Sequence, residues 1–256
     1  MRIPRQVLRR LLMDRMKAKV VFGKLLIGLE SVVENKICLK FGDGSNEENV
    51  DLLIGADGIR SSVVKLVVPN VPGPKYLGVM IILGIAEFNH PLLDERGFYT
   101  LDGNHRLFTM PYEERSSEIH KARVMWQLSY NLADEDESRK LSLEGPKSLR
   151  DEVLRRCRYW HDPVVELIHA TSLETIWGTG LMDRDPEELV RDIAGCKFSN
   201  VVVLGDAAHS MSPFKGELGT KIATGEARGL IQNLICTMIY FSNSLSPLIE
   251  LISKTT

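Results

Sequence analysis

The chain of 256 residues is poor in cysteine and carries almost no net charge. Its four cysteines lie far apart and form no C-x-x-C pair, which argues against a zinc knuckle, a redox dithiol and a disulfide framework. A reducing compartment fits this cysteine usage best, and we expect the cytoplasm. The formal net charge of -2 gives no general attraction to nucleic acid or to an anionic membrane. No G-K-[ST] triplet occurs, so a P-loop is excluded.

Long hydrophobic runs are also missing. The most apolar window, residues 230–252, is interrupted by Asn243, Pro247 and Glu250 before the roughly 20 apolar residues that a bilayer span needs. Residues 1–19 are rich in arginine and amphipathic, like an organelle transit peptide, but their apolar side chains recur with helical spacing. We therefore expect a packed helix at each end of the chain and no transmembrane segment.

Apolar residues make up 44% of the chain and charged residues 26%, which is ordinary for a globular protein with a real core. Residues 24–58 predict a β-meander with a tight turn at Asp43-Gly44, whose third strand is the apolar stretch 51–54. From Tyr76 onward, strand-like segments rich in aromatic and aliphatic residues predict a mostly antiparallel sheet, followed by helices. The expected fold is therefore mixed α/β, with a sheet domain inserted into a discontinuous first domain.

Two apolar strands end in similar loops, GADGIRSS at residues 55–62 and GDAAHSMSPFKG at residues 205–216. Each loop places an aspartate beside a glycine, just after a strand and ahead of a predicted helix. In α/β sheets, ligands bind outside the carboxyl ends of the strands. A carboxylate there can accept a hydrogen bond from a sugar hydroxyl, glycine lets the backbone approach a phosphate, and the amides at a helix start favour anions. Together these features predict a nucleotide-like ligand.

Each loop taken alone has a simpler interpretation. Asp57-Gly58 can be a plain turn, Asp206 a helix N-cap and His209 an ordinary loop histidine. The occurrence of both loops in one ordered chain, with a proline and a further glycine in the second, favours the binding site.

The two loops closely resemble the second and third fingerprints of the FAD-dependent monooxygenases of the aromatic-hydroxylase (p-hydroxybenzoate hydroxylase-like) family. IPRQVLRRLL, residues 3–12, resembles the arginine-bearing helix that precedes them in that family. The resemblance runs in order from residue 3 to about residue 235. It implies an incomplete Rossmann-like FAD-binding domain made of residues 1–75 and 176–256, with an antiparallel substrate-binding sheet domain at residues 76–175.

The resemblance implies FAD contacts at nine positions: Arg5, Asp57, Gly58, Gly205, Asp206, Pro213, Gly216, Leu218 and Gly219. Arg5 would lie at the ribityl or pyrophosphate region, and Asp57 near the pyrophosphate and the path of the nicotinamide nucleotide. Asp206 would hydrogen-bond the ribityl chain, Pro213 would lie beside the isoalloxazine ring, and the backbone from Gly216 would face the pyrimidine edge. No metal site is expected.

The activity implied by the resemblance is the hydroxylation of a small aromatic or cyclic molecule, with NAD(P)H as reductant and a flavin hydroperoxide as oxidant. Because the cofactor carries the chemistry, a dedicated catalytic acid or base is not required. The aromatic strands could line the substrate pocket, although such side chains often simply fill a core; the candidates are Tyr99, Phe108, Met110, Trp126 and Tyr130.

One part of the family pattern is absent from this sequence. The family begins with a strand, a G-x-G-x-x-G turn and a helix that bind the ADP half of FAD, and no G-x-G-x-x-G occurs here. We expect the strand at residues 201–204 to present an open edge as a result. Two alternatives stay open: a catalytically inactive fragment with a structural or interaction role, and another flavin enzyme of the same fold, such as a halogenase or a reductase.

Overall fold

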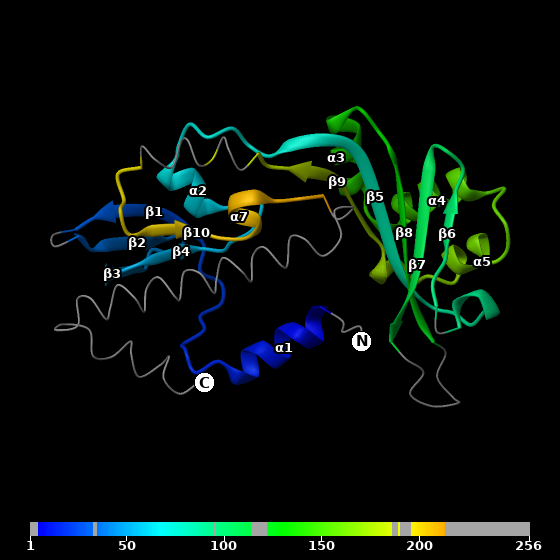
Figure 1. Ribbon diagram of the computed structural model, residues 1–256, viewed down its shortest axis with the longest axis horizontal. Coiled ribbons are helices and arrows are strands. Elements are labelled where there is room, and N and C mark those ends of the chain that lie inside the picture. Colours follow the sequence, from blue (N-terminus) through cyan, green and yellow to red (C-terminus); the bar gives the residue numbers. More distant parts are fainter. Residues whose placement is uncertain are drawn as a thin grey trace. The chain divides into compact units, whose positions relative to one another are not determined.

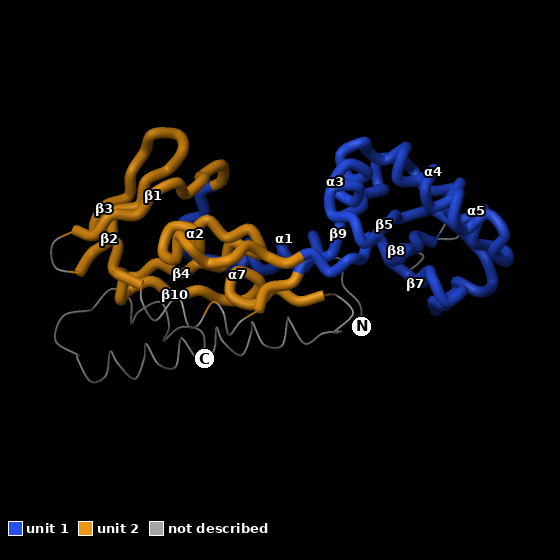
Figure 2. The backbone as a smooth tube through the Cα atoms, turned by 90° about the horizontal axis from the view of Figure 1, so that it is seen from above, with its two compact units in different colours: residues 1–21, 76–182 blue, residues 22–75, 183–256 orange. Residues whose placement is uncertain are grey.

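The computed structural model describes residues 5–32, 35–94, 96–113, 122–185, 189 and 196–212. The chain divides into two compact units, drawn in separate colours in Figure 2. Unit 1 comprises Met1–Val21 and Tyr76–Met182, and unit 2 comprises Phe22–Lys75 and Asp183–Thr256. The first 21 residues, which the sequence groups with the flavin-binding part, thus lie in unit 1.

Unit 1 is built on a five-stranded sheet with the strand order β6-β7-β8-β5-β9 (Figure 1). The strands are β5 (Lys75–Glu87), β6 (Tyr99–Leu101), β7 (His105–Glu113), β8 (Arg123–Asn131) and β9 (Trp177–Asp183). β5 pairs with β8, β8 with β7 and β7 with β6, all antiparallel. The predicted antiparallel sheet is therefore confirmed.

Three helices of unit 1 lie between β8 and β9 in the chain. They are α3 (Glu135–Glu144), α4 (Pro146–Cys157) and α5 (Val164–His169), with short 3-10 turns at η2 (Pro91–Leu93) and η3 (Leu173–Thr175). The charge run around residue 135 begins α3, because Asp134 caps its first turn by accepting from the amides of Asp136 and Glu137. Gly145, with φ +94°, separates α3 from α4.

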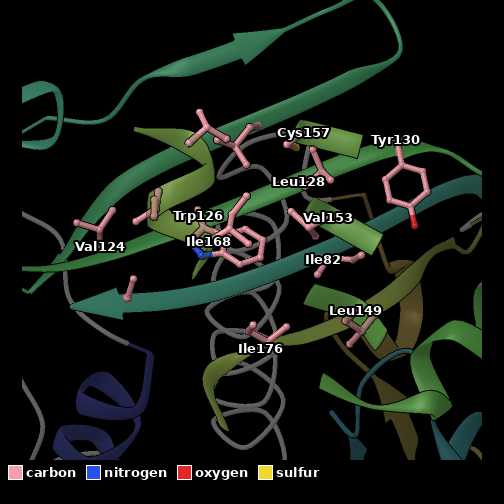
Figure 3. Packing of buried hydrophobic residues seen from close by; sticks show 14 of the residues in the cluster. Ile82, Val124, Trp126, Leu128, Tyr130, Leu149, Val153, Cys157, Ile168 and Ile176 are labelled. Carbon is pink, nitrogen blue, oxygen red and sulfur yellow. The ribbon is translucent and has the colours of Figure 1, made fainter. Parts of the chain in front are cut away.

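One face of this sheet is the core of unit 1. Side chains of β5, β7 and β8 pack against α4 and α5, as Figure 3 shows for Ile82, Trp126, Leu128, Val153 and Ile168. Trp126 is fully buried, and its Nε1–H donates to Thr171 Oγ1 at 2.9 Å. Successive side chains of a strand point to opposite faces, so Tyr130, four positions after Trp126 on β8, points to the same face and is also buried in the core. For Trp126 and Tyr130, the core interpretation is the right one and the pocket interpretation is wrong.

Unit 2 contains two separate sheets. β1 (Leu26–Ser31), β2 (Ile37–Phe41) and β3 (Asn46–Val50) form an antiparallel meander, with the predicted tight turn at Gly44, φ +82°. β3 is polar and mostly exposed, so no apolar pattern marked it in the sequence. The apolar stretch predicted as the third strand of the meander instead forms β4 (Leu53–Gly55), which pairs in parallel with β10 (Val201–Val203). In the described residues, β4 is the one strand paired with β10.

The predicted N-terminal helix is present as α1 (Arg5–Arg15), but none of its residues is buried. Its apolar residues Val7, Leu8, Leu11 and Leu12 are between 39% and 60% exposed, so the expected packing is not observed. No helix in the described ranges is long and apolar enough to cross a membrane.

Candidate cofactor site at the ends of two parallel strands

The parallel pairing of β4 and β10 brings the two aspartate loops to the same edge of a sheet. Leu53 lies opposite Val201 and Gly55 opposite Val203. The Leu204 amide extends the pairing by donating to Gly55 O at 2.9 Å. Both loops therefore begin at the carboxyl ends of adjacent strands, where α/β proteins bind their ligands.

Asp57 caps the helix that follows its loop. Its Oδ2 accepts from the amide of Ser62 at 2.7 Å and from that of Val63 at 3.2 Å, at the start of α2 (Ser62–Val67). Ser61, the N-cap residue, accepts from the Val64 amide at 3.0 Å. The first amides of α2 are thus occupied by side chains of the chain itself. The expectation that they bind an anionic ligand is wrong for this loop, because a donor bound to a side chain is not available to a phosphate.

Two glycines shape the first loop for different reasons. Gly58 has φ +80°, a conformation that favours glycine, and no atom lies within 4 Å of where its Cβ would be. Gly55 allows α2 to approach β4, because a Cβ there would lie 2.9 Å from Val63 Cβ. Gly55 is not among the predicted contact residues. Its packing role is indicated in the sequence by a glycine that ends an apolar strand shortly before a helix.

The second loop leaves its aspartate free. Gly205, with φ +58°, is the N-cap residue of the single-turn helix α7 (Asp206–His209), and no side-chain hydrogen bond caps this helix. Asp206 is therefore the first residue of the helix, and its interpretation as an N-cap is wrong. It is exposed, and its carboxylate and the amides of Asp206 and Ala207 make no hydrogen bond to any residue that the structure describes. This group of one carboxylate and two amide donors can bind a ligand that carries hydroxyl and anionic groups.

His209 contributes to the local packing of the second loop. It is 8% exposed, and its amide donates to Gly205 O at 2.9 Å. Beneath both loops lies Arg184, a buried arginine that no motif singled out.

The other five predicted contacts fall into two groups. Arg5 is exposed at the start of α1 and belongs to unit 1. The remaining four, Pro213, Gly216, Leu218 and Gly219, lie outside the described residues. Across the described ranges, no group of three or more histidine, cysteine, aspartate or glutamate side chains could hold a metal ion.

The sheet of unit 1 presents a second group of aromatic residues on the face opposite its core. Phe108 and Met110 alternate with the buried Leu107 and Thr109, so they point away from the helices. The ring of Tyr99 stacks on that of Phe108 with 4.8 Å between centroids, and Tyr99 is 54% exposed. Three of the five aromatic-strand candidates thus lie on a face that the core does not use.

Comparisons with known proteins identify relatives of the chain at 26–29% sequence identity. The chain is 28% identical to a chloroplastic zeaxanthin epoxidase of an Oncidium hybrid cultivar, over 84% of this chain and 30% of that protein. It is 27% identical to the monooxygenase cfoF of Aspergillus candidus, over 91% of this chain and 56% of that protein. No protein-family model matches the chain.

The fold of the chain matches that of a solved flavoprotein. The crystal structure of Klebsiella pneumoniae HpxO in complex with FAD and uric acid superposes with a TM-score of 0.64 and 24% identity. The match covers 84% of this chain and 50% of HpxO. The chain is a relative of the FAD-dependent monooxygenases. It resembles the aromatic-hydroxylase type, and its mixed fold of helices and antiparallel sheet agrees with that resemblance.

This relative of the FAD-dependent monooxygenases is short beside its homologues. It spans about a third of the zeaxanthin epoxidase and little more than half of cfoF. Both matched proteins are enzymes by name, an epoxidase and a monooxygenase.

Proposed function

We propose that unit 2 forms part of an FAD site, and that the chain serves a flavin-dependent monooxygenase reaction driven by NAD(P)H. The observation that carries the proposal is the position of the Asp206 loop. An exposed carboxylate that has no hydrogen-bond partner among the described residues lies at the carboxyl end of β10, directly beside the loop that follows β4.

The residues of the two loops fit the chemistry of FAD. Asp206 would accept a hydrogen bond from a ribityl hydroxyl, and the neighbouring amides of Asp206 and Ala207 would donate to oxygen atoms of the cofactor. The positive φ of Gly58, with open space at its Cβ position, would let a ligand approach the backbone closely. The flavin, when bound, supplies electron transfer and oxygen activation, while these residues bind and orient it.

The roles of the remaining site residues rest on the family resemblance. Arg5 is proposed at the ribityl or pyrophosphate region, Pro213 beside the isoalloxazine ring, and the backbone at Gly216, Leu218 and Gly219 at the pyrimidine edge. Asp57 is proposed to act mainly through α2, since its carboxylate already caps that helix.

We propose that residues 76–175 bind the substrate and that residues 1–75 and 176–256 serve the cofactor. The free aromatic face of the sheet, with Tyr99 stacked on Phe108, supports a small aromatic or cyclic substrate. HpxO, which shares the fold, was solved with uric acid, a molecule of this kind.

Flavin titration tests the proposal directly. The purified chain, and the longest product of its gene, are mixed with FAD, and flavin fluorescence and the visible spectrum are recorded. Binding near micromolar Kd that weakens in Asp206→Ala supports the site, with Asp94→Ala, an exposed aspartate of unit 1, as the control. If neither protein binds flavin, or if neither oxidises NAD(P)H in the presence of FAD, the proposed function is wrong.

The same site would also serve a reductase or a halogenase, because the residues described here contact the cofactor rather than the substrate. Uncoupled NAD(P)H oxidation without oxygen incorporation would indicate a reductase, and chloride-dependent product formation a halogenase. The cytoplasm remains our proposed compartment, and a fluorescent fusion that enters chloroplasts or other organelles would contradict it.

A further inference from the structure

Arg184 is a buried cation directly after β9, and it connects three segments of unit 2. The residue is 7% exposed. Its Nη1 donates to Pro72 O and its Nη2 to Ile59 O, both at 3.3 Å. Its backbone amide donates to Ser210 O at 3.2 Å.

The guanidinium group has no carboxylate partner in the part of the chain that the structure describes. Its acceptors are two backbone carbonyl oxygens, and its Nε is buried without an acceptor, as is the hydroxyl of Ser210. Burial lowers the pKa of Arg184. A buried charge is normally paired, because the loss of hydration is costly. A buried guanidinium group without a carboxylate partner contributes little to core stability. Its role is better explained by the segments that its hydrogen bonds connect.

The connected segments are those of the candidate site. Ile59 lies in the loop of Asp57, Pro72 follows α2, and Ser210 directly follows α7 in the loop of Asp206. A guanidinium group can donate from two nitrogen atoms to two separate carbonyls in a fixed plane, whereas the single nitrogen of lysine cannot reproduce that geometry. An aliphatic side chain would make neither bond.

We propose that Arg184 is a positioning residue that fixes the Asp57 loop relative to the Asp206 loop and so sets the spacing at which they receive the cofactor. The cofactor part rests on the proposed function, whereas the connection between the loops does not. Arg184 holds both ends of the α2 segment through its side chain and the second loop through its backbone amide. Loss of the side chain therefore releases the Asp57 loop from the residue that is bonded to the Asp206 loop, while the backbone bond to Ser210 remains.

Hydrogen exchange of the full chain tests the connection between the loops. In Arg184→Met and Arg184→Lys, we expect amides of residues 57–64 to exchange about ten- to a hundredfold faster, as the loss of the charge-assisted hydrogen bonds to Ile59 and Pro72 implies. Amides of residues 205–212 should change less, because the backbone bond to Ser210 is kept. Amides of β1 and β2 should keep their wild-type rates. Arg60→Met, which removes an exposed arginine from the same loop, should leave all rates unchanged.

Three outcomes decide the matter. Unchanged exchange in the Asp57 loop overturns the proposal, and so does equal acceleration throughout unit 2, because that result describes an ordinary stabilising residue. The proposal is supported if guanidinium ion slows hydrogen exchange of the Asp57 loop in Arg184→Ala, while sodium ion at equal ionic strength does not.

FAD titration of the same variants separates this proposal from the proposed function. If the wild-type chain binds FAD, Arg184→Met should raise Kd about tenfold or more, whereas an unchanged Kd with loosened loops overturns the cofactor part alone. If wild-type protein binds no FAD, the proposed function and the cofactor part both fail, and hydrogen exchange still decides whether Arg184 connects the loops.

Discussion

The carboxylate of Asp57 accepts a hydrogen bond of 2.7 Å from the backbone amide of Ser62. Asp206, which lies in the loop after the neighbouring strand, accepts none from the described residues. The two aspartates look alike in the sequence, since each follows an apolar strand and a glycine. Their environments give them different tasks: Asp57 organises a helix, whereas Asp206 remains available to a ligand. This difference leads to predictions that separate stability from binding.

Replacing Asp57 should destabilise the protein. Asp57→Ala removes the acceptor for the amides of Ser62 and Val63, and the loss of such a cap typically costs about 1 to 2 kcal/mol. Asp57→Asn keeps an acceptor oxygen and should lose less than half of that amount. Urea denaturation followed by circular dichroism measures both changes.

Serine substitution at a second exposed aspartate provides the control for this prediction. Asp94→Ser removes an exposed carboxylate in unit 1 and should change the free energy of unfolding by less than about 0.5 kcal/mol. Equal stability of Asp57→Ala and wild-type protein would show that the cap contributes nothing.

Replacing Asp206 should weaken FAD binding and leave the free energy of unfolding nearly unchanged, in contrast to replacing Asp57. Asp206→Ala removes an exposed carboxylate that makes no hydrogen bond within the described part of the chain, so stability should change by less than about 0.5 kcal/mol. The affinity for FAD should fall about ten- to a hundredfold, the usual effect of losing a hydrogen bond to a charged group. Fluorescence titration and urea denaturation of the same preparation give the two quantities. A strong loss of stability with unchanged flavin affinity would contradict the role of Asp206.

The close approach of α2 to β4 at Gly55 can be tested with a double variant. Gly55→Ala places a methyl group 2.9 Å from Val63 Cβ and should cost about 1 to 3 kcal/mol. Val63→Ala makes room for it, so the double variant should be more stable than the sum of the two single effects by about 1 kcal/mol or more.

Gly58→Ala supplies the matched control for the double variant. Its cost of about 1 to 2 kcal/mol comes from the positive φ rather than from crowding, since nothing lies within 4 Å of the new methyl group. Val63→Ala should therefore not relieve it. If the effects of Gly55→Ala and Val63→Ala on the free energy of unfolding simply add, α2 moves away from the new methyl group without strain.

The sequence predicted those features that depend on neighbouring residues. An apolar run that ends in a glycine, with an aspartate one or two residues later, is visible locally and marks both loops. Val124, Trp126, Leu128 and Tyr130 occupy every second position of β8. This period of two predicts that they share one face of the sheet, which is the face that packs in the core.

Other features depend on the tertiary structure and left no local pattern. The polar strand β3 forms because a tight turn places it beside β2, although its own side chains are exposed. Arg184 meets its acceptors across 112 and 125 positions of the chain, and an arginine in a charged stretch is ordinarily a surface residue. Only the folded arrangement shows that it lies beneath both loops.

Alkaline pH should destabilise the protein through groups buried in the core of unit 1. Burial raises the pKa of the Cys157 thiol and of the Tyr130 hydroxyl, each to about 12, although nearby Arg156 acts in the opposite direction on both. The unfolded chain loses these protons from about pH 9 and pH 10 upward, while the folded chain retains them. Stability should therefore be complete below pH 9 and fall toward pH 12, by at most about 1.4 kcal/mol per pH unit for each group.

Tyr130→Phe isolates one part of this effect. The hydroxyl of Tyr130 is buried without a hydrogen-bond partner among the described residues, and Phe keeps the ring that lies 3.5 Å from the Arg156 guanidinium. The variant should equal or exceed wild-type stability at pH 8, because no hydrogen bond is lost, and its advantage should grow between pH 10 and pH 12. Tyr159→Phe is the control, since Tyr159 is 84% exposed beneath Arg158 and should not change the pH profile. Lower stability of Tyr130→Phe at pH 8 would mean that the hydroxyl has a partner in the folded protein.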